Sequence, residues 1–172
     1  MRIVAGTFKG RDLTSPQDSR VRPTAEQTRA GVMDMLGGDL TGARVLDLFA
    51  GTGALGLEAI SRGALGADFV EFRPDSLHAL KANVAALGLK QRTRIFKKDA
   101  IPFAAALGPG SYDIAFADPP YGSRMIDRVL ESWEKQRFAR ILAVEHAASH
   151  VLPKGAKQRV FGDSAVTIYR SP

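Results

Sequence analysis

The segment Asp118-Pro119-Pro120-Tyr121 combines a carboxylate, a rigid backbone and an aromatic ring within a few residues. Two consecutive prolines fix the backbone and remove two N–H donors, which leaves the carbonyl of Pro119 as an acceptor beside the Asp118 carboxylate. Tyr121 adds a flat ring that can stack on a planar base. Acceptors that converge on an amino group beside such a ring predict a site for the amine of a nucleobase. The structural alternative is a proline-rich turn at the end of a strand.

A second segment, from Arg44 to Gly56, predicts a binding turn for a nucleotide-like ligand. It opens with a short apolar run interrupted only by Asp47, which is typical of a strand buried on both faces of a parallel sheet. The run ends at Ala50-Gly51-Thr52-Gly53, and a helical pattern begins at once. Glycines permit a tight turn, and unpaired N–H groups in the first turn of a helix can bind a ligand. The alternative is a turn that only connects strand and helix.

Acidic residues recur where the predicted strands end. These residues are Asp47, Glu71, Asp99 and Asp118. Ligands of doubly wound sheets bind at the carboxyl ends of the strands. Glu71 follows Gly51 at the spacing, about 20 residues, at which an acid accepts hydrogen bonds from ribose hydroxyls. Asp99 can equally cap the helix that follows it.

The elements that must position these residues alternate from residue 44 onwards. The alternation predicts an α/β fold, a doubly wound and mostly parallel sheet with an antiparallel hairpin at its C-terminal end. The expected strands are 45–49, 68–72, 93–96, 112–117, 141–144, 158–161 and 165–169. The expected helices of this part begin near residues 55, 74, 102 and 125. Before them, residues 1–13 predict a hairpin of two short strands, and 24–36 a helix capped by Thr24 with Gln27 as its capping-box partner.

Composition and charge limit the classes of function. A chain of 172 residues suits one domain with a full core, and no apolar run reaches the ~20 residues of a membrane span. There is no cysteine, which excludes disulfides, thiolate nucleophiles and cysteine zinc sites. His146 and His150 are four residues apart and could share a helical face, but no third ligand accompanies them, so we expect no metal. The start of the chain is too poor in apolar residues for a secretory signal, so we expect a soluble cytoplasmic protein.

The net charge of +6 is unevenly distributed. Basic residues cluster in residues 1–30 and again in residues 90–98. Such clusters favour a polyanionic partner, although a solvated surface explains them equally well.

The motifs together resemble those of class I S-adenosylmethionine-dependent methyltransferases, and more closely the bacterial small-subunit ribosomal RNA guanine-N2 methyltransferases of the RsmD type. The resemblance runs almost from end to end. It rests on Arg2-Ile3-Val4-Ala5-Gly6, Lys9-Gly10-Arg11, Arg22-Pro23-Thr24, the glycine turn with its strand, Asp118-Pro119-Pro120-Tyr121 and Phe161-Gly162-Asp163-Ser164. It implies a Rossmann-like methyltransferase sheet, S-adenosyl-L-methionine as the cofactor, and 16S ribosomal RNA or the small ribosomal subunit as the partner. It also implies a monomer without metal or membrane.

The resemblance further implies a role for each matching residue. Asp118, Pro119 and Tyr121 would hold the target base and are the expected catalytic residues. The expected cofactor-binding residues are Asp47, then Ala50, Gly51 and Gly53 for the methionine part, Glu71 for the ribose, and Phe72, Asp99 and Ala100 for the adenine. The expected substrate-binding residues are Arg11, Arg22, Pro23 and Thr24 together with Tyr121. We accordingly divide the chain into an RNA-contacting extension, residues 1–40, and a catalytic domain, residues 41–172.

Other functions use parts of the same pattern. An adenine-N6 methyltransferase of DNA has a similar proline turn, but it usually carries a target-recognition region for which this chain has little room. Another RNA guanine-N2 methyltransferase is a further alternative, although the N-terminal and C-terminal motifs narrow the resemblance to the RsmD type. An NAD-dependent oxidoreductase fits the glycines and Glu71, yet no Tyr-x-x-x-Lys appears. A non-catalytic RNA-binding module would explain neither the glycine turn nor Asp118-Pro119-Pro120-Tyr121.

Overall fold

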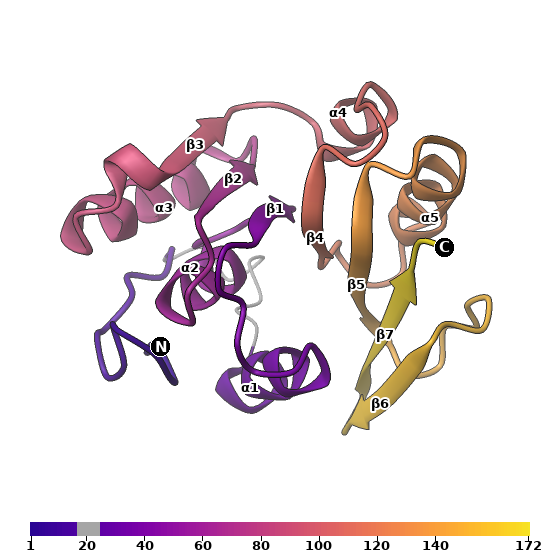
Figure 1. Cartoon of the computed structure of the whole chain (residues 1–172), viewed down its shortest axis with the longest axis horizontal. Coiled ribbons are helices and arrows are strands. Elements are labelled where there is room, and N and C mark those ends of the chain that lie inside the picture. Colours follow the sequence, from indigo (N-terminus) through magenta and orange to yellow (C-terminus); the bar gives the residue numbers. More distant parts are fainter. Residues whose placement is uncertain (17–24) are drawn as a thin grey trace.

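The computed structural model describes residues 1–16 and 25–172, and Figure 1 shows a twisted sheet with helices on both faces. The strands are β1 (Arg44–Leu48), β2 (Gly66–Val70), β3 (Thr93–Phe96), β4 (Tyr112–Ala117), β5 (Ala139–Ala147), β6 (Lys157–Phe161) and β7 (Ser164–Arg170). Their order is β3-β2-β1-β4-β5-β7-β6. The first five in this order are parallel, and β7 is antiparallel to both of its neighbours. The predicted doubly wound sheet with its C-terminal hairpin is confirmed.

Helices connect the parallel strands and cover the sheet. They are α1 (Glu26–Met35), α2 (Ala54–Ser61), α3 (Pro74–Ala86), α4 (Ala100–Ala105) and α5 (Met125–Gln136), with a short 3-10 helix η1 (Lys90–Arg92) before β3. The expected cap Thr24 and its neighbours Arg22 and Pro23 lie outside the described residues. Ala25 stands at the N-cap of α1 and makes no side-chain cap hydrogen bond. In the described part of the chain, no helix combines the length and apolar character that a membrane span requires.

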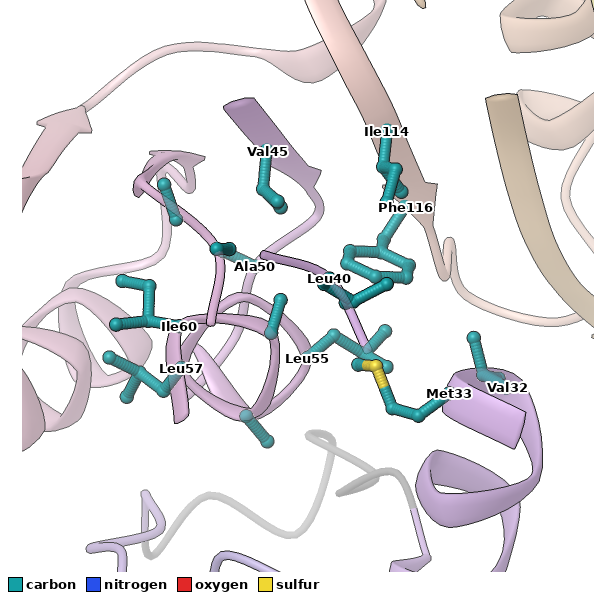
Figure 2. Close-up of a cluster of buried hydrophobic side chains, with 14 of the residues drawn as sticks. Val32, Met33, Leu40, Val45, Ala50, Leu55, Leu57, Ile60, Ile114 and Phe116 are labelled. Atoms are coloured by element: carbon teal, nitrogen blue, oxygen red, sulfur yellow. The ribbon is translucent and has the colours of Figure 1, made fainter. Parts of the chain in front are cut away.

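Two apolar cores lie on opposite faces of the sheet. One packs α1, α2 and α3 against β1 and β4, and Figure 2 shows Val45, Leu55 and Phe116 within it. The other packs α4 and α5 against the same strands and includes Leu46 and Trp133. Because side chains alternate along a strand, neighbouring residues of β1 enter different cores. The central strands are apolar on both faces because both faces are covered, and α5 is apolar on the one side that faces the sheet.

The strand register places the connections that follow β1, β2, β4 and β5 at one edge of the sheet. Leu48, the last residue of β1, is paired with Val70 of β2 and with Ala117 of β4. Ala117 is paired in turn with Val144 of β5. The residues that follow these four positions therefore leave the sheet at a common level. The strand order reverses between β1 and β4, which is the position where doubly wound sheets bind ligands.

The N-terminal segment differs from the predicted two-stranded hairpin. Its two halves pair in the antiparallel sense over a short stretch only: Arg2 and Asp12 form a bridge, and the N–H groups of Ile3 and Leu13 donate to the carbonyls of Arg11 and Met1 at 2.9 and 2.8 Å. The N–H groups of Val4 and Ala5 instead donate to the Glu58 carboxylate of α2, so they are not available to a sheet ladder. Gly6, at φ +87°, permits close approach to α2, because an added Cβ would lie 1.8 Å from the Ser61 carbonyl oxygen.

Two element boundaries also differ from the sequence-based expectation. β2 ends at Val70, two residues before the predicted end, so Glu71 lies in the connection that follows. β5 extends to Ala147 because the residues after Val144 pair with β7. His146 consequently lies in a strand, and the expectation that His146 and His150 share a helical face is wrong.

Candidate functional site

A cavity of about 410 Å³ opens at the carboxyl edge of the sheet, around the point where the strand order reverses. This volume suits a small organic ligand. Most of the sequence-predicted site residues line it. They are Asp47, Ala50, Gly51, Glu71, Phe72, Asp99, Ala100, Asp118, Pro119 and Tyr121. The glycine turn and the proline turn, 67 residues apart from Gly51 to Asp118, thus face one space.

The glycine turn is held by the carboxylate of Glu71. The N–H of Gly51 donates to Glu71 Oε2 at 2.8 Å. The N–H groups of Phe72 and Arg73 donate to its other oxygen at 3.0 Å. These three bonds fix the buried carboxylate at the cavity wall. Each carboxylate oxygen can accept more than one hydrogen bond, so Glu71 retains acceptor capacity for a ligand.

Asp47 links β1 to the start of α2. The N–H of Gly56 donates to Asp47 Oδ2 at 3.0 Å. Burial raises the pKa of the Asp47 carboxyl well above its ordinary value, the bond from Gly56 opposes this, and the nearby charges of Asp118 and Glu71 add to it. An added Cβ on Gly56 would lie 2.4 Å from the Phe69 ring, so glycine is needed for α2 to approach the strand this closely.

Most N–H groups of the glycine turn already donate within the protein, so they are only partly available to a ligand, contrary to expectation. The N–H groups of Gly51 and Gly56 donate to carboxylates, and that of Gly53 donates to the Ala50 carbonyl at 2.8 Å. Gly51 has φ +56°, and an added Cβ there would meet nothing within 4 Å. A ligand can hence approach the Gly51 backbone closely, whereas the turn amides chiefly orient acids.

Gly53 lies behind the turn and not among the cavity-lining residues. It stands at the N-cap of α2 with φ +82°, and an added Cβ would lie 2.4 Å from Leu80. Its geometry accounts for the start of the helix and for packing on α3. A direct contact of Gly53 with a cofactor remains a prediction.

The cavity wall beyond Glu71 carries residues suited to a flat ring. Phe72 is 53% exposed, which is high for a large apolar side chain. Asp99 is the N-cap of α4, where its Oδ1 accepts the Ile101 N–H at 3.1 Å, so the capping alternative is observed. Because Asp99 also lines the cavity, capping and ligand contact are compatible.

The proline turn forms the other wall of the cavity. Asp118 directly follows β4, Pro119 is buried, and Tyr121 is 36% exposed at the mouth. The hydroxyl of Tyr121 donates to Glu145 Oε1 of β5 at 3.2 Å. Glu145, which also lines the cavity, was not among the sequence-predicted site residues.

The lining is acidic although the chain is basic. Among the described residues, its charged side chains are five acids (Asp47, Glu71, Asp99, Asp118 and Glu145) and two bases (Arg73 and Lys98). This excess of negative charge favours a ligand that carries positive charge.

Of the predicted substrate-binding residues that the structure describes, Tyr121 lines the cavity and Arg11 does not. The Arg11 guanidinium donates to the carbonyl of Ala86 at the end of α3, at 2.8 Å, and so anchors the N-terminal segment. Arg22, Pro23 and Thr24 lie outside the described residues. Contacts of these residues with RNA stay predictions.

No group of three or more potential ligands is arranged around a metal position in residues 1–16 and 25–172. His146 Nε2 lies 2.9 Å from Thr167 Oγ1, and burial lowers its pKa below the ordinary value for a histidine. His150 Nε2 lies 3.2 Å from Asp127 Oδ1. Both histidines therefore have structural partners.

Comparison with known proteins gives consistent matches over nearly the whole chain. The model of the family described as "Conserved hypothetical protein 95" matches residues 1–170. The Escherichia coli K12 protein named Ribosomal RNA small subunit methyltransferase D is 30% identical over 179 residues, covering 99% of this chain and 89% of that protein. The structure of a hypothetical protein from Thermus thermophilus has a TM-score of 0.82 at 30% identity and covers 99% of each chain.

A more distant structure shares the fold. An RNA methyltransferase from Salinibacter ruber, solved in complex with S-adenosyl-L-homocysteine, has a TM-score of 0.69 and covers 88% of this chain and 94% of that chain. Its identity of 13% limits the likeness to the fold.

Proposed function

The chain belongs to the family described as Conserved hypothetical protein 95, the RsmD-type proteins, and from this premise we propose that it methylates the exocyclic N2 amine of a guanine in 16S ribosomal RNA. The proposed methyl donor is S-adenosyl-L-methionine. The proposed substrate is the small ribosomal subunit or a protein-bound assembly intermediate in the cytoplasm, and the enzyme acts as a monomer without metal. Residues 1–40 form its RNA-contacting extension, and residues 41–172 its catalytic domain.

One observation carries this proposal. The glycine turn with Glu71 and the proline turn with Tyr121 line a single cavity at the carboxyl edge of the sheet. A donor on the first wall and a base on the second would meet within that space. The function of an oxidoreductase or of a simple RNA-binding module would not require the proline turn with Tyr121 in the same cavity.

The residues present fit the proposed cofactor. Its sulfonium and amino groups are cationic, and the cavity lining carries five acids against two bases. The Glu71 carboxylate is held in place by three backbone N–H groups and can accept the hydroxyls of a ribose. The open space beside Gly51 admits the methionine part close to the backbone, and exposed Phe72 offers a face to the adenine. When bound, the cofactor supplies an electrophilic methyl group.

The protein's own contribution is to hold and orient the amine. The guanine amine is a weak nucleophile because its lone pair is delocalised into the ring. Hydrogen bonds to Asp118 and to the Pro119 carbonyl would localise that lone pair and direct it towards the methyl group. Alignment of this kind contributes ~7–11 kcal/mol when it is near ideal. Tyr121 would stack on a base that is unpaired or flipped out of its helix.

No strong general base is needed in this mechanism. The amine loses its proton after attack, when it carries a positive charge and is acidic. Asp118 can accept that proton or pass it to solvent, since it is only partly buried.

The donor is tested by calorimetry. Titration with S-adenosyl-L-homocysteine should give saturable binding, while NAD should give none. The Glu71→Ala variant should bind S-adenosyl-L-homocysteine at least about tenfold more weakly, a loss of ~1.4 kcal/mol. Binding of NAD in preference would favour the oxidoreductase alternative.

The acceptor is tested with the Asp118→Ala variant. Transfer of a labelled methyl group to small subunits from a strain lacking the enzyme should fall by at least about 100-fold, because Asp118 acts on the reacting amine. The affinity for S-adenosyl-L-homocysteine should stay nearly unchanged. Equal turnover in the variant would remove Asp118 from the mechanism.

The modified nucleotide is then mapped in the labelled RNA. Label on N2 of one guanine supports the proposal, and label on N6 of adenine contradicts it. Equal rates on assembled subunits and on free 16S ribosomal RNA would contradict the preference for the assembled particle.

A further inference from the structure

We propose that Glu145 is a specificity-determining residue that accepts the N1–H of the target guanine. This inference rests on the proposed function and deepens it, because it names the group that distinguishes guanine from other bases bearing an amine. Neither the sequence motifs nor the comparisons assign a role to this residue.

The register of the sheet places Glu145 beside Asp118. Ala117 of β4 is paired with Val144 of β5, and each of the two acids directly follows one of these residues. Adjacent strands lie about 4.8 Å apart, and side chains one position beyond a matched pair point to the same face. Both acids line the cavity. The carboxyl edge therefore presents two carboxylates side by side at the base-holding wall.

The carboxylate of Glu145 is buried and oriented. The residue is 8% exposed, is paired with Val166 of β7, and directly follows Val144, which is paired with β4, so its backbone position is fixed. Its Oε1 accepts the Tyr121 hydroxyl at 3.2 Å. The bond ties Glu145 to the ring on which the base is proposed to stack. A carboxylate held beside that ring is placed to meet the edge of the stacked base.

The chemistry of the base edge selects guanine. Guanine presents two neighbouring donors on its Watson–Crick edge, the N1–H and the N2 amine. Adenine presents a donor beside an acceptor, because its N1 carries no hydrogen, and cytosine does likewise at N3. Ionised carboxylates only accept hydrogen bonds. Two adjacent carboxylates, Asp118 for the amine and Glu145 for N1–H, therefore complement guanine, whereas Glu145 would face a lone pair of adenine or cytosine.

The decisive substrate carries 2-aminopurine in place of the mapped guanine, in 16S ribosomal RNA assembled into small subunits. This base keeps the amine on C2 but has no hydrogen on N1. For the natural enzyme, we expect kcat/KM to be about 10- to 100-fold higher with guanine, because N1 of 2-aminopurine places a lone pair against the Glu145 carboxylate. In the Glu145→Gln variant the amide can donate to N1 of 2-aminopurine, so the preference should fall to about threefold or less.

Matched variants separate this role from a structural one. Tyr121→Phe removes the hydroxyl that orients Glu145, so it should lower the preference for guanine part of the way towards that of Glu145→Gln. Glu131→Gln, on the exposed surface of α5, should change neither the rates nor the ratio. The loss of O6 in 2-aminopurine affects all variants alike, so the change in the ratio isolates N1.

The outcomes distinguish this inference from the proposed function. If Glu145→Gln lowers kcat/KM for guanine and 2-aminopurine by the same factor, Glu145 does not read N1 and the inference is overturned. If the natural enzyme transfers no methyl group to guanine at all, the proposed function itself fails. Unchanged S-adenosyl-L-homocysteine affinity shows that the variant is folded.

Discussion

At the scale of single residues, the acids of the cavity serve two purposes. Asp47 and Glu71 accept backbone N–H groups from the glycine turn, and they also form part of the ligand-facing wall. The turn is thus shaped by the same carboxylates that would bind a cationic cofactor. Buried charge is unfavourable unless it is compensated, so such a site opposes the stability of the unliganded fold.

This opposition leads to a prediction for Asp47→Asn. Burial raises the pKa of the folded Asp47 carboxyl, so the folded state binds the proton more tightly than the unfolded state. Stability is therefore lost as the pH rises from the ordinary carboxyl range through the raised pKa, and the loss persists at neutral pH. Asparagine keeps an acceptor for the Gly56 N–H but carries no charge. We expect thermal unfolding at pH 7 to show a gain on the order of 1 kcal/mol, which disappears below about pH 3.8.

Asp113→Asn is the matched control with the opposite sign. Although burial opposes it, hydrogen bonds from the Arg44 N–H and guanidinium lower the pKa of the Asp113 carboxyl. Its contribution to stability is present above the ordinary carboxyl range and is lost as the pH falls through the lowered pKa. The Asp113→Asn variant should lose stability at pH 7.

Asp47→Asn should in addition bind S-adenosyl-L-homocysteine more weakly. If this variant is more stable and its affinity is unchanged, the result would argue against a cofactor-binding role of Asp47.

At the scale of elements, the sequence predicts most of what lies within one strand or helix. The hydrophobic period and the turn residues locate all seven strands of the described chain and the helix α5, whose buried apolar side chains include Trp133. Glu145 could not be found in this way, because it continues an apolar run and gains its position only from pairing with β4 and β7. The N-terminal hairpin was predicted from spacing alone. The N–H groups of Ile3 and Leu13 do donate across this segment, but those of Val4 and Ala5 bond to a carboxylate more than 50 residues away.

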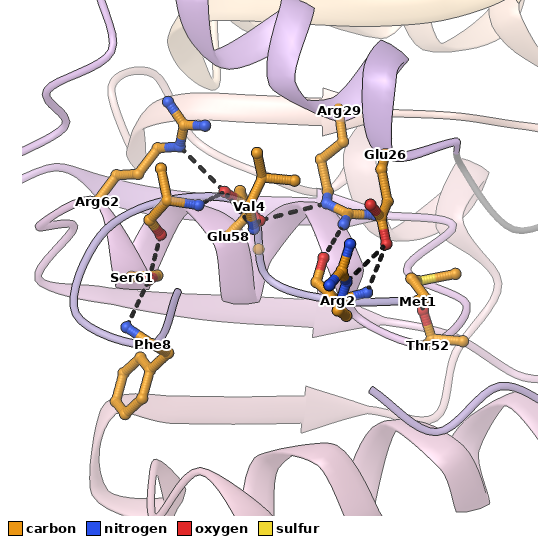
Figure 3. A network of polar contacts seen from close by, with 12 residues as sticks. Met1, Arg2, Val4, Phe8, Glu26, Arg29, Thr52, Glu58, Ser61 and Arg62 are labelled. Atoms are coloured by element: carbon orange, nitrogen blue, oxygen red, sulfur yellow. Dashed lines mark hydrogen bonds and ion pairs between the residues drawn. The ribbon is translucent and has the colours of Figure 1, made fainter. Parts of the chain in front are cut away.

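That carboxylate belongs to a buried polar cluster that joins the N-terminal segment to α1 and α2 (Figure 3). Glu58 of α2 accepts the N–H groups of Val4 and Ala5, Arg29 Nε at 3.3 Å and Arg62 Nε at 3.1 Å. The Arg29 guanidinium also donates to the Arg2 carbonyl. Glu58 and Arg29 are both fully buried.

The cluster predicts that Glu58→Ala is strongly destabilising. The substitution removes the carboxylate from a buried guanidinium and from two backbone donors, a change that costs about 3–5 kcal/mol for a buried ion pair. Chemical denaturation should report this loss, and hydrogen exchange should show that the amides of residues 3–5 lose protection. Glu26→Ala, which disrupts the exposed pair with Arg2 at 3.8 Å, should cost about 1 kcal/mol or less. Similar losses for both variants would show that the buried cluster does not anchor the segment.

At the scale of the whole molecule, charge is separated between surface and cavity. The chain carries a net charge of +6, while the described residues of the cavity lining include five acids and two bases. A polyanion is attracted to the surface, whereas its phosphates are disfavoured inside the cavity. Only a base, which is neutral, and a cationic donor suit the interior. This separation favours entry of a flipped base without its backbone.

The separation predicts different salt dependences for the two ligands. Phosphate contacts release counterions, so KM for small subunits should rise by about tenfold or more between 50 and 200 mM salt, while S-adenosyl-L-homocysteine affinity changes little. Arg124, exposed at the N-cap of α5 three residues after Tyr121, lies on the cavity edge of the sheet. Arg124→Gln should lower the slope of log KM against log salt by about one. Lys90→Gln, in η1 before β3 and thus at the opposite edge, should leave the slope unchanged. Equal effects of the two variants would mean that RNA is attracted by net charge alone and that the cavity edge does not contact its backbone.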